Sequence, residues 1–82
     1  MDKIIVTSYG FVREADPEIF VAVIHLHIDG AVLEIFSEEI FPTKEAAIAF
    51  LKTEIRPITA TFCEKVGLEI TNSSITIDPR IH

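Results

Sequence analysis

The sequence contains no tryptophan, one cysteine and three glycines among its 82 residues, and the shortages of cysteine and glycine each exclude a class of protein. Because Cys63 has no second cysteine to pair with, the chain is not a disulfide-stapled secreted scaffold. The three glycines are not grouped, so no glycine-rich loop of the kind that cradles phosphates is present. The longest apolar run, Ile19–Ile24, is far shorter than the roughly 20 residues that span a bilayer.

Length and hydropathy together favour a small globular domain that self-associates. Residues 1–82 correspond to one domain, and a hydrophobic content of 49% excludes intrinsic disorder. Met1–Ser8 contains an acid and too short an apolar stretch for a secretion signal, so we expect a cytoplasmic protein. A domain of this size buries only about 60–65% of its unfolded surface, which makes its stability marginal. The mean hydropathy of +0.40 is high for a small monomer and indicates association.

Three β-rich segments precede the middle of the chain. Residues 3–12 are rich in β-branched and aromatic types and predict a strand, followed by a polar connection over residues 13–18. Two further β-rich runs flank Asp29–Gly30 within residues 19–41. Because Asp and Gly tolerate positive φ, this dipeptide predicts a two-residue type I′ hairpin turn.

The turn fixes the register of the hairpin and divides its side chains between two faces, since neighbouring residues of a strand point to opposite sides. The register places His25 opposite Glu34 and Val23 opposite Phe36. One face is entirely apolar and consists of Ile24, Leu26, Ile28, Leu33 and Ile35. The other face is about half apolar and consists of Val21, Val23, His25, His27, Val32, Glu34, Phe36 and Ile40.

A long helix follows the hairpin. Apolar residues spaced by three and four predict one helix over residues 43–66, kinked at Pro57. Thr43 is expected to cap its first turn, and Gly67 is expected to end it. The predicted apolar stripe consists of Ala47, Leu51, Ile55, Ile58, Phe62 and Val66.

The remaining residues complete the predicted architecture. Residues 68–77 predict a final strand, and residues 78–82 predict a loose tail. The fold class is therefore α+β in the order β-β-β-α-β, with a mixed, mainly antiparallel sheet of about four strands and one long, Pro-kinked helix on one face. Because the helix acts as a crossover, we expect the last strand to run parallel to the third.

A single helix can cover only one face of this sheet, which leaves the half-apolar face of the hairpin without a cover. An exposed apolar patch of several hundred Å² usually marks an interaction surface. The sequence therefore predicts a homodimer that associates through Val21, Val23, Val32, Phe36 and Ile40. The alternative is that the connection at residues 13–18 or the C-terminal tail folds over this face.

The charges are distributed unevenly along the chain, whose formal net charge is −6. Residues 14–43 contain seven acids and no Lys or Arg. Binding to a phosphate backbone needs the opposite sign, so nucleic acid is not an expected partner. An acidic hairpin favours a basic protein partner, or it serves solubility and protects the strand edge.

His25 and His27 are the most specific chemical feature of the sequence. They lie two residues apart on a strand and therefore point to one side, and Glu34 is expected opposite His25. Two imidazoles and a carboxylate form a possible Zn²⁺ or Fe²⁺ site, and the spacing faintly resembles the metal motif of cupins. The alternative is a structural cross-strand pair between His25 and Glu34. We predict that Cys63 is a buried, unreactive thiol.

The hairpin followed by Thr43–Ile48 resembles the β-β-α unit of HicB-type antitoxins over roughly residues 19–55. The shared element is a capped helix with an alanine-rich start. The Gly/Pro-rich strand-end segment of that family has no counterpart in this sequence, so we do not assign the chain to it.

These observations favour a small non-catalytic interaction or regulatory domain that self-associates through its sheet and presents an acidic hairpin. No Ser-His-Asp set or close pair of acids defines a catalytic centre, so no catalytic or cofactor-binding residue is predicted. Two alternatives remain. One is a metal-binding protein or metal-dependent enzyme that uses His25, His27 and Glu34. The other is an inhibitor- or antitoxin-like protein that neutralises a basic partner.

Overall fold

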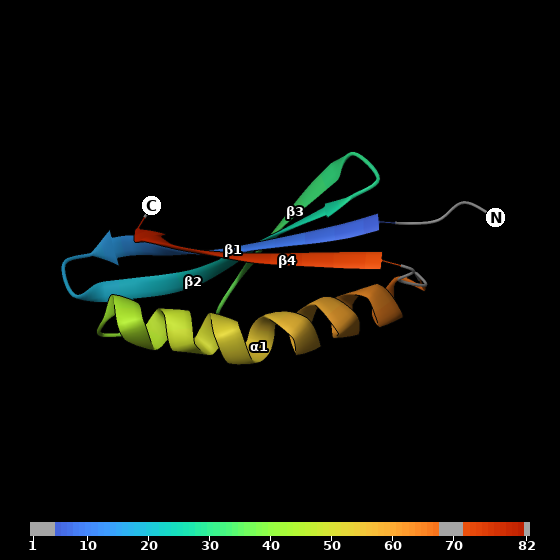
Figure 1. The fold of residues 1–82 in the computed structure, drawn as a ribbon. Helices are drawn as coiled ribbons and strands as arrows, with labels where there is room; N and C mark the ends of the chain where they lie inside the picture. The colour runs from blue at the N-terminus through green and yellow to red at the C-terminus, as the bar shows by residue number, and fades with distance from the viewer. Residues whose placement is uncertain (1–4, 68–71, 82) are drawn as a thin grey trace.

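The computed structural model describes residues 5–67 and 72–81 and shows one helix packed on one side of a four-stranded sheet (Figure 1). This arrangement confirms the predicted α+β class and the β-β-β-α-β order. The elements are β1 (Ile5–Asp16), β2 (Ile19–Ile28), β3 (Ala31–Phe36), α1 (Lys44–Lys65) and β4 (Asn72–Ile81).

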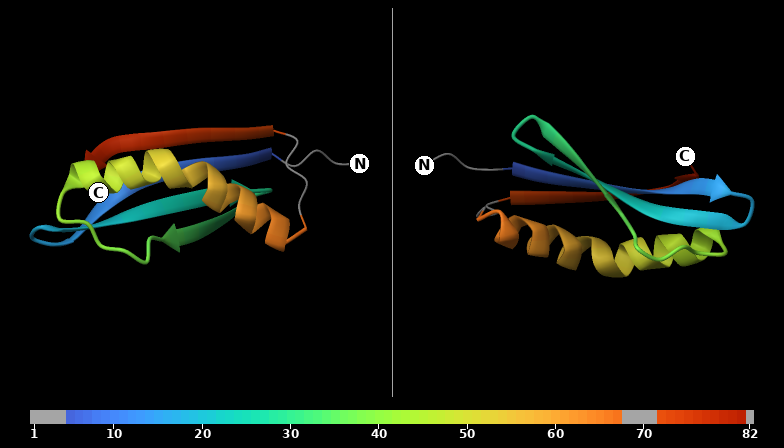
Figure 2. Two further views of the ribbon diagram at one scale, coloured as in Figure 1. Left: turned by 90° about the horizontal axis from the view of Figure 1, so that it is seen from below. Right: turned by 180° about the vertical axis from the view of Figure 1, so that it is seen from behind.

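The strand order across the sheet is β3-β2-β1-β4. β1 and β2 pair antiparallel, as do β2 and β3, whereas β4 pairs parallel with β1. β4 therefore runs in the same direction as β3, as predicted, although the two strands lie at opposite edges. The helix connects these edges and crosses the sheet on its way (Figure 2).

The second hairpin has the predicted turn and register. Asp29 and Gly30 have positive φ values of 47° and 83°, which is the conformation that a type I′ turn requires. The pairs His25–Glu34 and Val23–Phe36 follow directly from this turn.

The prediction of a polar connection over residues 13–18 is wrong. β1 continues to Asp16, and only Pro17 and Glu18 form the turn to β2. Glu18 takes a positive φ of 65°, and the strand has an irregularity between Glu14 and Asp16. The polar composition of this segment suggested a loop, but ladder pairing with β2 makes it a strand. Arg13, which pairs with Val21, is thereby placed on the sheet.

The helix begins and ends as its sequence predicts. The Thr43 hydroxyl accepts a hydrogen bond of 3.1 Å from the Ala46 N–H, and Gly67 follows the C-cap with a φ of 73°. α1 is continuous through Pro57, and its axis bends in this region (Figure 2). Proline removes the donor for the Thr53 carbonyl, but Thr53 and Pro57 are both exposed, so water can satisfy that carbonyl. Within the described residues, no helix combines the length and apolar character needed to cross a bilayer.

The core lies between α1 and the adjacent side of the sheet, which we call the helix face. The buried stripe of α1 agrees with the prediction as far as Ile55 but then differs from it. The stripe consists of Ala47, Leu51, Ile55, Thr59 and Cys63, so Cys63 is buried as predicted. Ile58 and Phe62 are only partly buried at the margin, and Val66 is 51% exposed. After Ile55 the structure thus uses a step of four residues where the sequence analysis used three.

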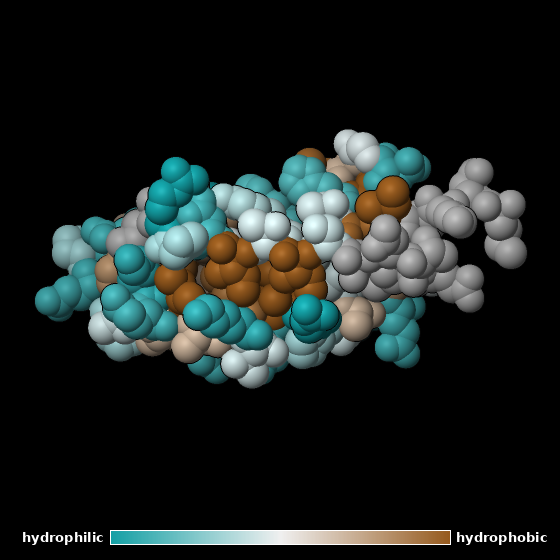
Figure 3. Space-filling model, viewed as in Figure 1, coloured by the Kyte–Doolittle hydropathy of each residue, from teal (hydrophilic) through white to brown (hydrophobic). Residues whose placement is uncertain are grey.

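The final strand is displaced relative to its prediction. β4 occupies residues 72–81, so the predicted loose tail is mostly strand. Residues 68–71 of the predicted strand lie outside the described residues, as does the expected contact of Leu68 with the helix. Ile75 and Ile77 of β4 pack against the core and remain partly exposed, and apolar surface is visible where β4 borders α1 (Figure 3).

A buried polar contact joins the helix to the centre of the sheet. The Thr59 hydroxyl donates to the Ile55 carbonyl at 2.7 Å and lies 2.9 Å from the Ser8 hydroxyl. Because the single hydrogen of Thr59 is used on Ile55, the Ser8 hydroxyl donates to Thr59. Ser8 is fully buried, so its hydroxyl depends on this acceptor.

We predict that Thr59→Val lowers the free energy of unfolding by about 1–3 kcal/mol, because it leaves the Ser8 hydroxyl buried without an acceptor. Ser8→Ala should lower the free energy of unfolding by a smaller amount, since the Thr59 hydroxyl keeps its hydrogen bond to the Ile55 carbonyl. Adding Ser8→Ala to Thr59→Val should therefore recover part of the loss. Urea denaturation of the four proteins measures these differences, and equal, additive effects of the two substitutions would contradict the assigned donor.

Candidate functional site: the open face of the sheet

The face of the sheet opposite α1, which we call the open face, carries the residues singled out from the sequence. The β-pairing places side chains of all four strands on this face. They are Thr7, Tyr9, Phe11 and Arg13 of β1; Val21, Val23, His25 and His27 of β2; Val32, Glu34 and Phe36 of β3; and Ser74, Thr76, Asp78 and Arg80 of β4.

Part of the open face is covered by its own side chains. Val23 is fully buried and Phe11 is only 5% exposed, although α1, the helix of the described residues, lies on the other side of the sheet (Figure 1). The Arg13 guanidinium lies 5.7 Å from the centre of the Phe11 ring and 5.6 Å from that of the Phe36 ring. Arg13 thus contributes cation–π contacts and shields apolar surface with its aliphatic stem. This cover comes from β1 itself and not from a loop.

A polar row crosses the open face next to this apolar centre. Glu34 Oε2 lies 2.6 Å from His25 Nε2 and 3.6 Å from Arg13 Nη2. The hydrogen bond from His25, together with the charge of Arg13, lowers the pKa of Glu34 below its ordinary value, against the opposing effect of burial. The Phe11 ring meets the His25 ring edge-on at 4.9 Å between centres. The expected His25–Glu34 pair is therefore formed.

The three candidate metal ligands are not brought together as a set. His27 is exposed and pairs with Val32, one row away from the His25–Glu34 contact. Throughout residues 5–67 and 72–81, no group of three His, Cys, Asp or Glu side chains is arranged to hold a metal ion. The predicted Zn or Fe site therefore receives no geometric support beyond the His25–Glu34 pair.

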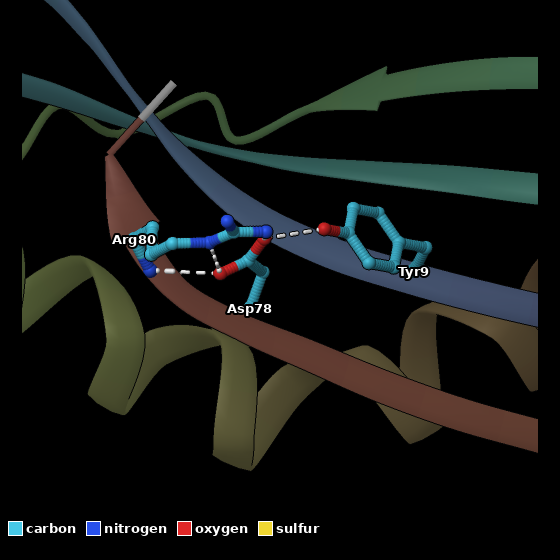
Figure 4. A network of polar contacts seen from close by, with 3 residues as sticks. All are labelled: Tyr9, Asp78 and Arg80. Atoms are coloured by element: carbon cyan, nitrogen blue, oxygen red, sulfur yellow. Dashed lines mark hydrogen bonds and ion pairs between the residues drawn. The ribbon is translucent and has the colours of Figure 1, made fainter.

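A second polar network, which the sequence analysis missed, joins β1 to β4 (Figure 4). The Tyr9 hydroxyl donates to Asp78 Oδ2 at 2.5 Å. Arg80 donates to the same carboxylate from its backbone N–H at 2.9 Å, its Nε at 3.1 Å and its Nη2 at 3.0 Å. Asp78 is only 6% exposed, so the network satisfies a buried charge.

This network fixes the end of β4 and is structural in character. Each oxygen of Asp78 accepts two hydrogen bonds: Oδ2 from the Tyr9 hydroxyl and Arg80 Nη2, and Oδ1 from the Arg80 backbone N–H and Nε. The nearby carboxylate raises the pKa of Tyr9 and that of Arg80, which keeps both groups protonated. This interaction holds Asp78 and Arg80 of the predicted tail against β1, and an isolated Asp gives no sequence signal for it.

Exposed apolar side chains gather toward β3. Val32 is 54% exposed, Phe36 is 50% exposed, and Ile40 in the following connection is 65% exposed. Val21 is half-buried. Of the five predicted interface residues, only Val23 is fully buried within the chain, where a partner cannot contact it.

Comparison of the chain with protein-family models, curated proteins and solved structures gives no significant match.

The lowered pKa of Glu34 predicts how the stability of the fold depends on pH. Because the folded-state pKa is lowered, ionised Glu34 stabilises the fold near neutral pH, and this contribution is lost as the pH falls through the folded-state pKa. His25→Ala should raise the pKa of Glu34 toward its ordinary value, since the hydrogen bond from His25 is the main cause of the shift. NMR titration of the side-chain carboxyl carbons measures this.

His27→Ala is the matched control, because it removes an imidazole from the same strand without touching Glu34. It should leave the titration of Glu34 unchanged. An unchanged midpoint in His25→Ala would show that the contact does not exist in solution.

Proposed function

We propose that the protein is a cytoplasmic, non-catalytic interaction domain that self-associates as a dimer through the open face of its sheet, around β3. The observation that carries this proposal is the group of exposed apolar side chains Val32, Phe36 and Ile40, on and directly after β3. Isolated apolar residues are common on protein surfaces, but a group on one strand marks a contact surface.

The energetics support association of moderate strength. At about 25 cal/mol per Å², covering about 300 Å² of apolar surface contributes several kcal/mol before the entropic cost of association. The apolar centre formed by Phe11 and Val23 is already covered by Arg13 within one chain. The proposed contact therefore shifts away from this centre toward β3.

The chemistry of the open face favours binding over catalysis. Its carboxylates Glu34 and Asp78 already accept hydrogen bonds from neighbouring side chains of the same chain. Carboxylates held in this way order the surface and are poorly placed to transfer protons to a substrate. The single buried Cys63 fits a reducing compartment.

We predict that Val32→Thr combined with Phe36→Ser weakens dimerisation by at least about tenfold, because it removes the two exposed apolar groups of β3. Sedimentation equilibrium over a range of concentrations measures the effect. Val66→Thr is the control, since Val66 is 51% exposed, close to the 54% of Val32, but lies at the end of α1.

Ionic strength gives an independent check. Since each copy carries a formal charge of −6, screening should strengthen self-association between about 50 and about 500 mM salt. A particle that keeps the 9.2 kDa mass of one chain at every concentration would overturn the proposal.

A further inference from the structure

A groove runs between the C-terminal half of α1 and β3. Because α1 packs on β1, β2 and β4 but not on β3, this side of the sheet is not fully covered. The groove has a volume of about 460 Å³ and an apolar floor formed by Ile35, Pro57, Ile58 and Phe62. An adjoining hollow of about 330 Å³, which shares Ile35 and Ile58, extends it toward Phe50.

The groove exists because of the step in the helix stripe after Ile55. Since Thr59 and Cys63 face the core, Ile58 and Phe62 point to its margin and remain partly exposed. The same two side chains line the groove beneath β3. The apolar residues that the sequence analysis placed in the core thus form an accessible surface.

β3 also has a free backbone edge beside this groove. In an antiparallel pair, alternate residues direct their N–H and C=O groups toward the partner strand. A two-residue turn at Asp29–Gly30 makes Ala31, Leu33 and Ile35 the residues that bond to β2. The Ser37 N–H, which donates to the Ala22 carbonyl at 2.9 Å, continues this alternation.

The intervening residues Val32, Glu34 and Phe36 therefore direct their N–H and C=O groups to the outer edge. β3 is the last strand on this side of the sheet, and within the described part of the chain no other strand pairs with it. A strand added here would alternate its side chains between the open face and the helix face. Those on the helix face would reach the groove.

The charges around the groove indicate what kind of strand fits. Glu54 lines the groove and Glu38 and Glu39 line the adjoining hollow, and none of the three has an ion-pair partner among the described residues. Lys65 is the one basic residue that lines the groove in this part of the structure. A second copy of β3 would bring its own Glu34, Glu38 and Glu39 to this acidic edge, which is unfavourable. A basic segment would instead be attracted to this acidic edge.

We infer that β3 and the groove between β3 and α1 bind an extended, basic segment of another protein by strand addition, with alternate apolar side chains in the groove. The backbone of the bound segment pairs with Val32, Glu34 and Phe36. The negative charges of Glu38, Glu39 and Glu54 attract this basic segment. This surface lies on the helix face and at the edge of β3, whereas the proposed dimer contact lies on the open face, and Phe36 borders both.

The test uses the full chain and a synthetic peptide of about seven residues in which Lys and Val alternate, a length typical of a strand. A peptide of the same composition with its Val residues adjacent tests alternation, and a peptide with Glu in place of Lys tests charge. Calorimetry at low salt should show binding of the alternating peptide only. Its affinity should fall as salt is added, the opposite of the trend expected for dimerisation.

Thr61→Arg places a long side chain in the groove, since Thr61 is an exposed residue of its lining. It should weaken peptide binding by at least about tenfold. Thr53→Arg is the matched control, because it adds the same charge at an exposed position of α1 that does not line the groove. It should reduce affinity only slightly.

Amide hydrogen exchange provides a signature specific to strand addition. On binding, the N–H groups of Val32, Glu34 and Phe36 should become protected, whereas those of Leu33 and Ile35 are protected already. Three results would each overturn the inference: no binding of the alternating peptide, equal binding of all Lys-containing peptides, or equal effects of Thr61→Arg and Thr53→Arg. Loss of dimerisation in Thr61→Arg would also overturn it, since the groove would then be filled by a second copy.

Discussion

The structure depends on one constraint: a single helix must cover a sheet of four strands. α1 has 22 residues and is about 33 Å long, which is close to the length of the ten-residue strands beneath it. It is nevertheless only one helix wide. Its C-terminal half lies beside β3 without packing on it, so α1 buries the helix face of the inner strands and leaves β3 at the margin (Figure 2). The core consequently lies on β1 and β2, while β3 keeps exposed apolar side chains and, as far as the described residues show, an unpaired backbone edge.

The open face also lacks a covering helix among the described residues, but its apolar side chains are shielded in a different way. None of the described helices and strands covers it, so its side chains cover one another. Arg13 lies between Phe11 and Phe36, and Glu34 holds Arg13 and His25 in place. Such a surface is ordered by local contacts that each contribute little, typically about 0.5–1 kcal/mol for an exposed cation–π contact. It is therefore well suited to present a defined shape to a partner.

Features fixed by local chemistry could be predicted from the sequence. The Asp29–Gly30 turn determines its own φ angles, and through them the register that brings His25 to Glu34. The Thr43 cap and the end of the helix at Gly67 depend likewise on neighbours in the chain. The candidate site was predictable to the same extent, because the hairpin alone decides which of its side chains share a face.

Features decided by distant parts of the chain could not be predicted. The sequence predicts Arg13 in a loop, because its place in β1 depends on pairing with Val21 of β2. It predicts Asp78 in a loose tail, because the order of this residue depends on Tyr9 of β1. The predicted buried stripe of the helix is wrong from one position onward. From Ile55, hydropathy favours Ile58 over Thr59, but the Ser8 hydroxyl supplies the partner that makes Thr59 the buried residue.

The pairing of β1 with β4 brings together the earliest and latest described strands of the chain. Contacts between segments so far apart in sequence close a large loop, and folding slows as such contacts come to dominate. During synthesis, β1 has only β2 as a neighbour until residues 72–81 have emerged from the ribosome. For most of that time its other edge is open to wrong partners, and a chaperone or a fast rate of translation would shorten the exposure.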